Sequence, residues 1–114
     1  MKVKINNNAV DYARELIEHN KLEKDEKDNW SEHAPSTDDQ NNFIEKKGME
    51  EYSKWFLGIN SEEDKDNKGR YEFPYGDFNK VHRGAVIAAK VRAGQYKHQE
   101  IEDAADELLK MIDT

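Results

Sequence analysis

The strongest constraint on the fold is a helical repeat at the end of the chain. Apolar residues recur there every three or four positions, at Ile101, Ala104, Ala105, Leu108, Leu109 and Ile112. This spacing places them on one face of an α-helix and leaves the charged residues between them on the other face. The sequence therefore predicts an amphipathic last helix beginning near His98, whose apolar face other parts of the chain must cover.

The residues before this helix differ from it sharply in charge. Residues 79–99 contain five lysines and arginines and no acid, in a chain of net charge -7, whereas residues 100–114 contain six acids and one lysine. An alanine- and valine-rich stretch predicts a helix over 81–93, closed by a left-handed cap at Gly94. Because helices joined by a short turn pack antiparallel, we expect 79–114 to form a helical hairpin in which the basic and acidic members pair.

Shorter patterns predict three helices upstream. Apolar residues within 10–17 follow a helical rhythm. Ser36 followed by Asp39 is typical of a capping box, which would start a helix that ends at Gly48. A further helix is predicted over 49–57, where three large aromatic residues are spaced three and four apart and are expected in the core. These are Tyr52, Trp55 and Phe56.

Polar stretches separate these helices. Residues 21–29 are almost entirely charged and indicate a solvated connector, and residues 60–69 indicate an acidic loop. Residues 70–78 alternate aromatic and polar side chains before a proline and a glycine, which is typical of a short extended segment at an edge. We therefore expect one domain over 1–114, mainly α, forming a compact small bundle of about four to five helices with a short extended or β aromatic segment at 70–78.

Composition excludes several classes of protein. The chain has no cysteine, so disulfide frameworks and thiolate metal sites are excluded. The sequence contains no apolar run long enough to predict a membrane span and no apolar leader, which favours a cytoplasmic location. A pI near 5.1 argues against general affinity for nucleic acid, since phosphate contacts from basic side chains dominate that affinity.

The acidic loop resembles a calcium-binding loop only in part. Asp64, Asp66 and Gly69 fall at the first, third and sixth positions of such a loop. The fifth position would be Lys68, a cation facing a cation, and the twelfth would be Tyr75, where a glutamate is needed. We therefore expect a solvated loop and no metal ion.

Candidate catalytic residues are confined to one junction. The sequence contains no nucleophile elbow, phosphate loop or dinucleotide fingerprint, and its four histidines lack the spacing of a zinc site on one helix. Tyr75, Asp77, His82 and Arg83 would place a possible acid or base near the start of a helix. Because no nucleophile or metal accompanies them, the sequence favours a protein that is not an enzyme and predicts no cofactor.

The basic residues offer a candidate binding surface. On a helical wheel Lys80, Arg83 and Lys90 share one side, so their exposed side would contact a partner, with Tyr75 and His82 at its rim. The alternative is that these cations only pair with the acidic last helix. A protein partner or self-association is favoured over nucleic acid. A basic helix followed by a turn is also typical of a DNA-binding helix-turn-helix, which stays as the alternative.

Several segments resemble a family of small bacterial and archaeal proteins to which no activity is assigned. The resemblance covers most of residues 10–113. It rests on FPYGDFNKVHR at 73–83, AAK at 88–90, RAGQY at 92–96, IEDAA at 101–105, WSEHAP at 30–35 and EYSKWFLGI at 51–59. The C-terminal portion is also similar in style to a short module found beside phage and prophage capsid-maturation proteins. Neither resemblance implies a cofactor or a catalytic residue.

Three functions follow as hypotheses. The first is a non-enzymatic interaction or adaptor module, because the sequence patterns account for the helices and turns of a folded domain and no catalytic motif accompanies them. The second is a nucleic-acid-associated or phage-derived protein, and the third is a small enzyme that uses Asp77 and His82.

Overall fold

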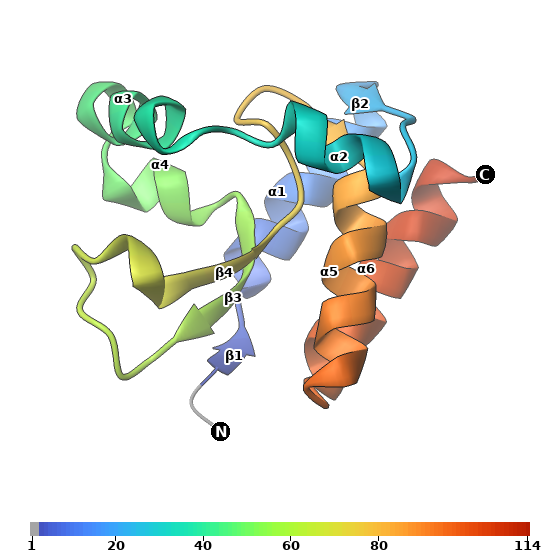
Figure 1. Ribbon diagram of the computed structural model, residues 1–114. Coiled ribbons are helices and arrows are strands. Elements are labelled where there is room, and N and C mark those ends of the chain that lie inside the picture. The colour runs from blue at the N-terminus through green and yellow to red at the C-terminus, as the bar shows by residue number, and fades with distance from the viewer. Residues whose placement is uncertain (1–2) are drawn as a thin grey trace.

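The computed structural model describes residues 3–114 of the chain. Short strands are interspersed among the helices along it (Figure 1). In chain order the elements are β1 (Val3–Ile5), α1 (Asn7–Glu18), β2 (Leu22–Glu23), α2 (Lys27–His33), α3 (Thr37–Lys47), α4 (Met49–Ser53), β3 (Phe56–Asn60), the 3-10 helix η1 (Lys68–Arg70), β4 (Tyr71–Pro74), β5 (Val81–His82), α5 (Arg83–Gln95) and α6 (Gln99–Ile112).

The fold is α+β, so the prediction of a mainly α bundle was wrong. Three strands form an antiparallel sheet in the order β1-β3-β4, and β2 pairs with β5 in a second, parallel sheet of two strands. The longest strand, β3, has five residues and the shortest have two. Strand β4 lies within the extended aromatic segment predicted at 70–78. The other strands are too short to show a clear alternation of apolar and polar residues, which explains why the sequence pattern misses them.

Strand β3 occupies part of the segment that was predicted as a helix over 49–57. Helix α4 ends at Ser53, and the chain then extends through β3. Gly58 lets the sheet pack closely on α6, because a Cβ there would lie 2.8 Å from Cδ2 of Phe73 and 3.1 Å from Cδ1 of Ile101. The three aromatic residues predicted in the core are buried, as expected: Tyr52, Trp55 and Phe56.

Several predicted helix ends are confirmed. Ser36 and Asp39 form the capping box of α3, with both of its hydrogen bonds at 3.1 Å. Gly48 ends α3 at a φ of 90°. The left-handed cap predicted at Gly94 was wrong, because α5 continues to Gln95 and Lys97 adopts the positive φ instead.

The two C-terminal helices form the predicted hairpin. Helices α5 and α6 run side by side in Figure 1, and α1 lies behind the sheet near them. The core lies between these helices and the three-stranded sheet. Its largest fully buried side chains are Tyr75, Leu57, Ile101, Leu108, Val81 and Val86. Within residues 3–114, none of the helices is both long and apolar enough to span a bilayer.

Candidate functional site

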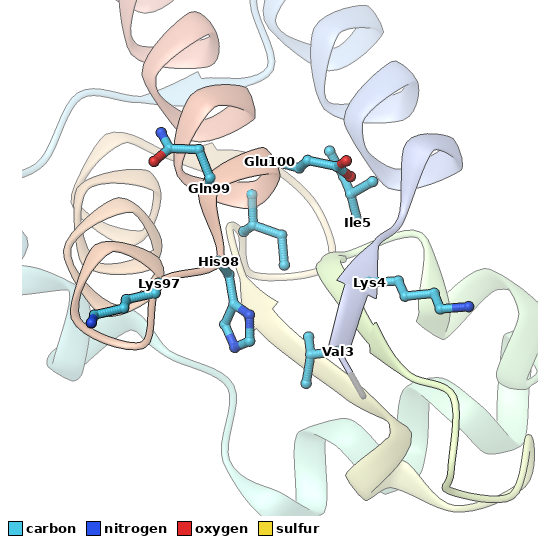
Figure 2. A pocket seen from close by; sticks show the side chains of 8 residues that line it. Val3, Lys4, Ile5, Lys97, His98, Gln99 and Glu100 are labelled. Carbon is cyan, nitrogen blue, oxygen red and sulfur yellow. The ribbon is translucent and has the colours of Figure 1, made fainter. Parts of the chain in front are cut away.

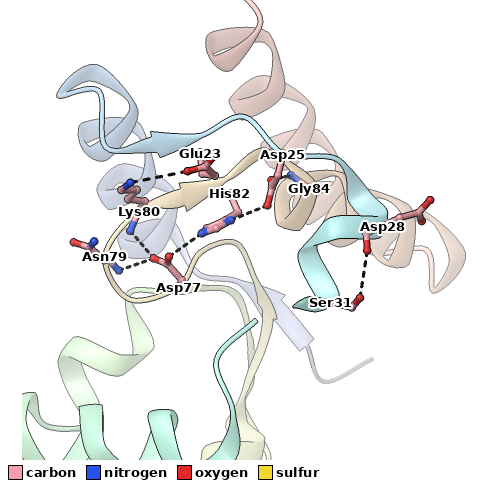
Figure 3. Close-up of polar contacts among 9 residues, drawn as sticks. All are labelled: Glu23, Asp25, Asp28, Ser31, Asp77, Asn79, Lys80, His82 and Gly84. Atoms are coloured by element: carbon pink, nitrogen blue, oxygen red, sulfur yellow. Dashed lines mark hydrogen bonds and ion pairs between the residues drawn. The ribbon is translucent and has the colours of Figure 1, made fainter. Parts of the chain in front are cut away.

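The charged connector predicted at 21–29 helps to build a buried histidine junction. Strand β2 lies in this connector and pairs with β5 so that Glu23 stands beside His82. Two residues further on, Asp25 reaches the imidazole of His82 (Figure 3). The loop before β5 brings Asp77 to the other side of the ring, where its Oδ1 also accepts hydrogen bonds from the amides of residues 79 and 80.

Both nitrogens of the imidazole are held by carboxylates. Nδ1 of His82 lies 2.8 Å from Oδ2 of Asp25, and Nε2 lies 2.8 Å from Oδ2 of Asp77. The ring is only 3% exposed and packs beside the rings of Trp30 and His33, whose centroids lie 5.1 and 5.4 Å away. We call Asp25, Asp77 and His82 the histidine junction.

The geometry favours a protonated imidazole. Ionised carboxylates only accept hydrogen bonds, so both ring nitrogens must donate, which requires the imidazolium form. Burial lowers the pKa of His82, but its hydrogen bonds to Asp25 and Asp77 outweigh burial and raise the pKa above the ordinary value. Burial raises the pKa of Asp77, whereas its bonds to His82 and to two backbone amides lower it below the ordinary value overall. The junction therefore joins one positive and two negative groups.

The histidine junction fastens three segments of the chain together. It links the β2–α2 connector, the β4–β5 loop and the first turn of α5, where Oδ1 of Asp25 accepts a hydrogen bond of 2.7 Å from the amide of Gly84. Gly84 must lack a side chain, because a Cβ there would lie 2.2 Å from the carbonyl oxygen of Glu26. These contacts are those of a structural clamp.

The junction is poorly arranged for catalysis. Tyr75, Asp77, His82 and Arg83 were singled out as the candidate reactive group, and the structure does place Asp77 against His82. Neither nitrogen of that ring is free to accept a proton from a substrate. The hydroxyl of Tyr75 is also occupied, since it donates to the carbonyl oxygen of Lys54 at 2.7 Å.

The residues of the predicted binding surface lie in three different environments. Tyr75 and His82 are buried. Arg83 forms two hydrogen bonds with Asp113, the residue that follows α6, at 2.8 and 3.2 Å. Lys90 bonds Asp106 within α6 at 2.8 Å. Lys80 is half exposed, with its Nζ 4.0 Å from a carboxylate oxygen of Glu23. The pairing expected between the basic and acidic helices of the hairpin is thus present, and it engages two of the three predicted surface cations.

The opposite end of α5 carries exposed groups instead. Val91 and Tyr96 are the exposed large hydrophobic residues of the described chain, with 39% and 54% of their surface exposed. The guanidinium of Arg92 lies over the ring of Tyr96, 5.4 Å from its centroid. Among residues 3–114, Arg92 has no carboxylate within ion-pairing distance. We call Val91, Arg92, Tyr96 and Lys97 the turn surface; on a helical wheel Arg92 faces away from the other cations, so sequence reasoning set it aside.

An open hollow of about 500 Å³ lies next to the turn surface, between β1 and the start of α6 (Figure 2). Figure 2 shows the ring of His98 on the side of Val3, while Lys4 and Lys97 point outward in different directions. The lining is part apolar and part charged and consists of Val3, Lys4, Ile5, Lys97, His98, Gln99, Glu100 and Ile101. Sequence reasoning missed this hollow because it depends on β1, a strand of three residues.

Comparison with known proteins identifies no relative: no family model, no curated protein and no solved structure matches the chain. The resemblances to a bacterial and archaeal family and to a phage-associated module therefore stay predictions. The function must be inferred from the geometry of the chain itself.

Proposed function

We propose that the protein is a non-enzymatic interaction module that contacts a protein partner through the turn surface. The observation that carries this proposal is the exposed Tyr96 with the guanidinium of Arg92 over its ring, and with no carboxylate of residues 3–114 within ion-pairing distance of that guanidinium. Tyrosine and arginine are enriched at protein interfaces, where they contribute a large share of the binding energy. A partner can therefore cover an aromatic ring and supply a carboxylate at the same place.

The arrangement of the turn surface lowers the entropic cost of binding. Stacking on Tyr96 restricts the long side chain of Arg92 before a partner arrives, so less rotamer freedom is lost on association. Val91 adds exposed apolar area on the same end of α5. The turn surface thus combines an aromatic ring, an aliphatic side chain and a guanidinium that has no ion pair within residues 3–114.

The two other functions have weaker support. A nucleic-acid surface needs a row of free cations, but Arg83 and Lys90 on α5 are paired with Asp113 and Asp106. An enzyme at the Asp77–His82 contact needs a free ring nitrogen, and both nitrogens face carboxylates. An interaction role is the one that the exposed groups favour.

A capture experiment with matched variants tests the proposal. Tagged wild-type protein is compared with the double variant Arg92→Glu/Tyr96→Ala and with Lys47→Glu, which reverses an exposed charge on α3, far from the turn surface in sequence. Quantitative mass spectrometry is expected to find a protein that wild type and Lys47→Glu retain and the double variant loses. If all three forms retain the same proteins equally, or if retention requires nucleic acid and disappears with added salt, the proposal is wrong.

A further inference from the structure

We infer that the outer edge of β1, together with the hollow beside it, binds an extended acidic segment of a protein partner as an additional strand. This inference rests on the proposed function, because it specifies the kind of partner and a second part of the contact. Lys97 belongs to the turn surface and also lines the hollow, so one partner can use both.

The two edges of the sheet differ in their ability to accept a strand. Strand β4 contains Phe73 at a φ of 65° and ends at Pro74, which has no amide proton, so its outer edge cannot present a regular ladder. Strand β1 has neither feature. Within residues 3–114 it pairs with β3 alone, which makes it the more open edge.

The hydrogen-bonding groups at this edge point away from β3. The amide of Asn6 donates to the carbonyl oxygen of Leu57 at 2.8 Å, and the orientation alternates along an antiparallel strand. Lys4 therefore also bonds toward β3, whereas the N–H and C=O groups of Val3 and Ile5 face outward. Outside the β1–β3 pairing, the described residues supply no backbone partner for them.

The hollow beside β1 suits side chains that alternate in character. Val3, Ile5 and Ile101 supply apolar lining, and Lys4 points to the opposite side of the strand (Figure 2). Lys4 and Lys97 have no ion pair within residues 3–114, and Glu100 is the one acid in the lining. An incoming strand with an acid opposite Lys4 and apolar residues on either side of that acid would match this pattern.

Charge also argues against a second copy of this chain as the occupant. A two-fold antiparallel pairing that uses both outward residues of each β1 would place Val3 opposite Ile5 and Lys4 opposite Lys4. Like charges directly opposite each other destabilise a strand pair. The same lysine therefore disfavours self-pairing and favours an acidic partner segment.

Two blocked pentapeptides provide the test, Thr-Val-Glu-Val-Thr and its matched control Thr-Val-Lys-Val-Thr. Each is titrated into the full chain while NMR follows the amide shifts and hydrogen exchange of Val3 and Ile5. We expect the glutamate peptide to shift and protect these amides and to bind about three- to tenfold more tightly than the lysine peptide. Lys4→Glu should invert the preference, and Lys47→Glu should leave it unchanged.

Three results would overturn the inference. In the first, neither peptide changes the amide signals of Val3 and Ile5. In the second, Lys4→Glu does not alter the preference between the peptides. In the third, the protection of these amides rises with protein concentration in the absence of peptide, which would mean that copies of the chain pair with each other. If Arg92→Glu/Tyr96→Ala abolishes partner capture while the β1 amides stay silent, the proposed function stands and this inference alone fails. If the glutamate peptide binds β1 but capture never depends on Arg92 and Tyr96, the proposed function fails at the turn surface.

Discussion

The two ends of α5 carry similar residues but use them differently. At the N-terminal end, His82 is enclosed between Asp25 and Asp77, and Arg83 is bonded to Asp113. At the C-terminal end, Arg92 has a tyrosine ring beneath it and no described carboxylate beside it. A high content of basic residues therefore does not locate a binding surface, because the positions of the acids decide which cations remain unpaired.

The free-energy cost of losing a charged group differs accordingly. A buried ion pair is worth little when intact relative to an apolar pair, but removing one partner leaves an uncompensated buried charge. An exposed arginine without an ion pair keeps most of its hydration, so its removal changes the free energy of folding little. The stability of the fold should therefore depend on the charged groups at the N-terminal end of α5, and partner binding on those at its C-terminal end.

Among the variants that test the two ends of α5, His82→Ala is expected to lower the free energy of unfolding most. The substitution leaves the carboxylate of Asp25, whose side chain is 7% exposed, without its charged partner. We expect the free energy of unfolding to fall by about 3–5 kcal/mol in urea denaturation. His19→Ala is the control, since His19 is exposed, and it should change stability by less than about 0.5 kcal/mol. Equal effects of the two variants would mean that the histidine junction is not a clamp.

A smaller effect is expected from pH. The raised pKa of His82 gives a stabilisation that is complete below its ordinary pKa of about 6.5 and is lost as pH rises through the folded-state value. The lowered pKa of Asp77 gives a stabilisation that is complete above about pH 4 and is lost as pH falls through its folded-state value. Both contributions are complete between roughly pH 4 and pH 6.5.

Thermal unfolding from pH 5.5 to 9.5 checks this expectation. The Tm of the wild type should decline toward alkaline pH more steeply than the Tm of His82→Gln, in which the titrating ring is gone. The stability that the wild type loses at alkaline pH should be smaller than the stability lost in His82→Ala, because a neutral imidazole still donates one of the two hydrogen bonds. Parallel declines in the two proteins would show that His82 is not the group responsible.

The smallest expected effect is a difference in the free energy of unfolding between alanine variants of two arginines on α5. Arg83→Ala removes a guanidinium that is bonded twice to Asp113, so stability should fall slightly. Arg92→Ala removes a guanidinium that has no ion pair in the described part of the chain and should change the free energy of unfolding by less than about 0.5 kcal/mol. High salt should narrow the difference, since it screens the exposed pair with Asp113. A larger loss for Arg92→Ala than for Arg83→Ala would contradict the division of α5 into a structural end and a binding end.

Sequence patterns predicted the elements that have strong local signals. The last helix follows from its repeat of apolar residues, and α3 follows from Ser36, Asp39 and Gly48, whose side chains or lack of one act within a few residues of themselves. The alternation at 70–78 predicted β4. Strands β1 and β3 were missed because they are short, and because Phe56 and Leu57 are apolar neighbours that fit a buried helix as well as a strand. Asp25 was missed because nothing distinguishes it locally from the other charged residues around it.

The sequence by itself determined the helical hairpin, the pairing of its basic and acidic members and the burial of the large aromatic residues, since each depends on spacing or on groups close together in the chain. Tertiary structure alone decided which charges meet over long separations, as in the contact between Asp25 and His82, and which edge of the sheet stays open. The physical reason is that a carboxylate in a solvated connector and one inside a clamp have the same local sequence. They differ only in what the rest of the fold brings within hydrogen-bonding distance.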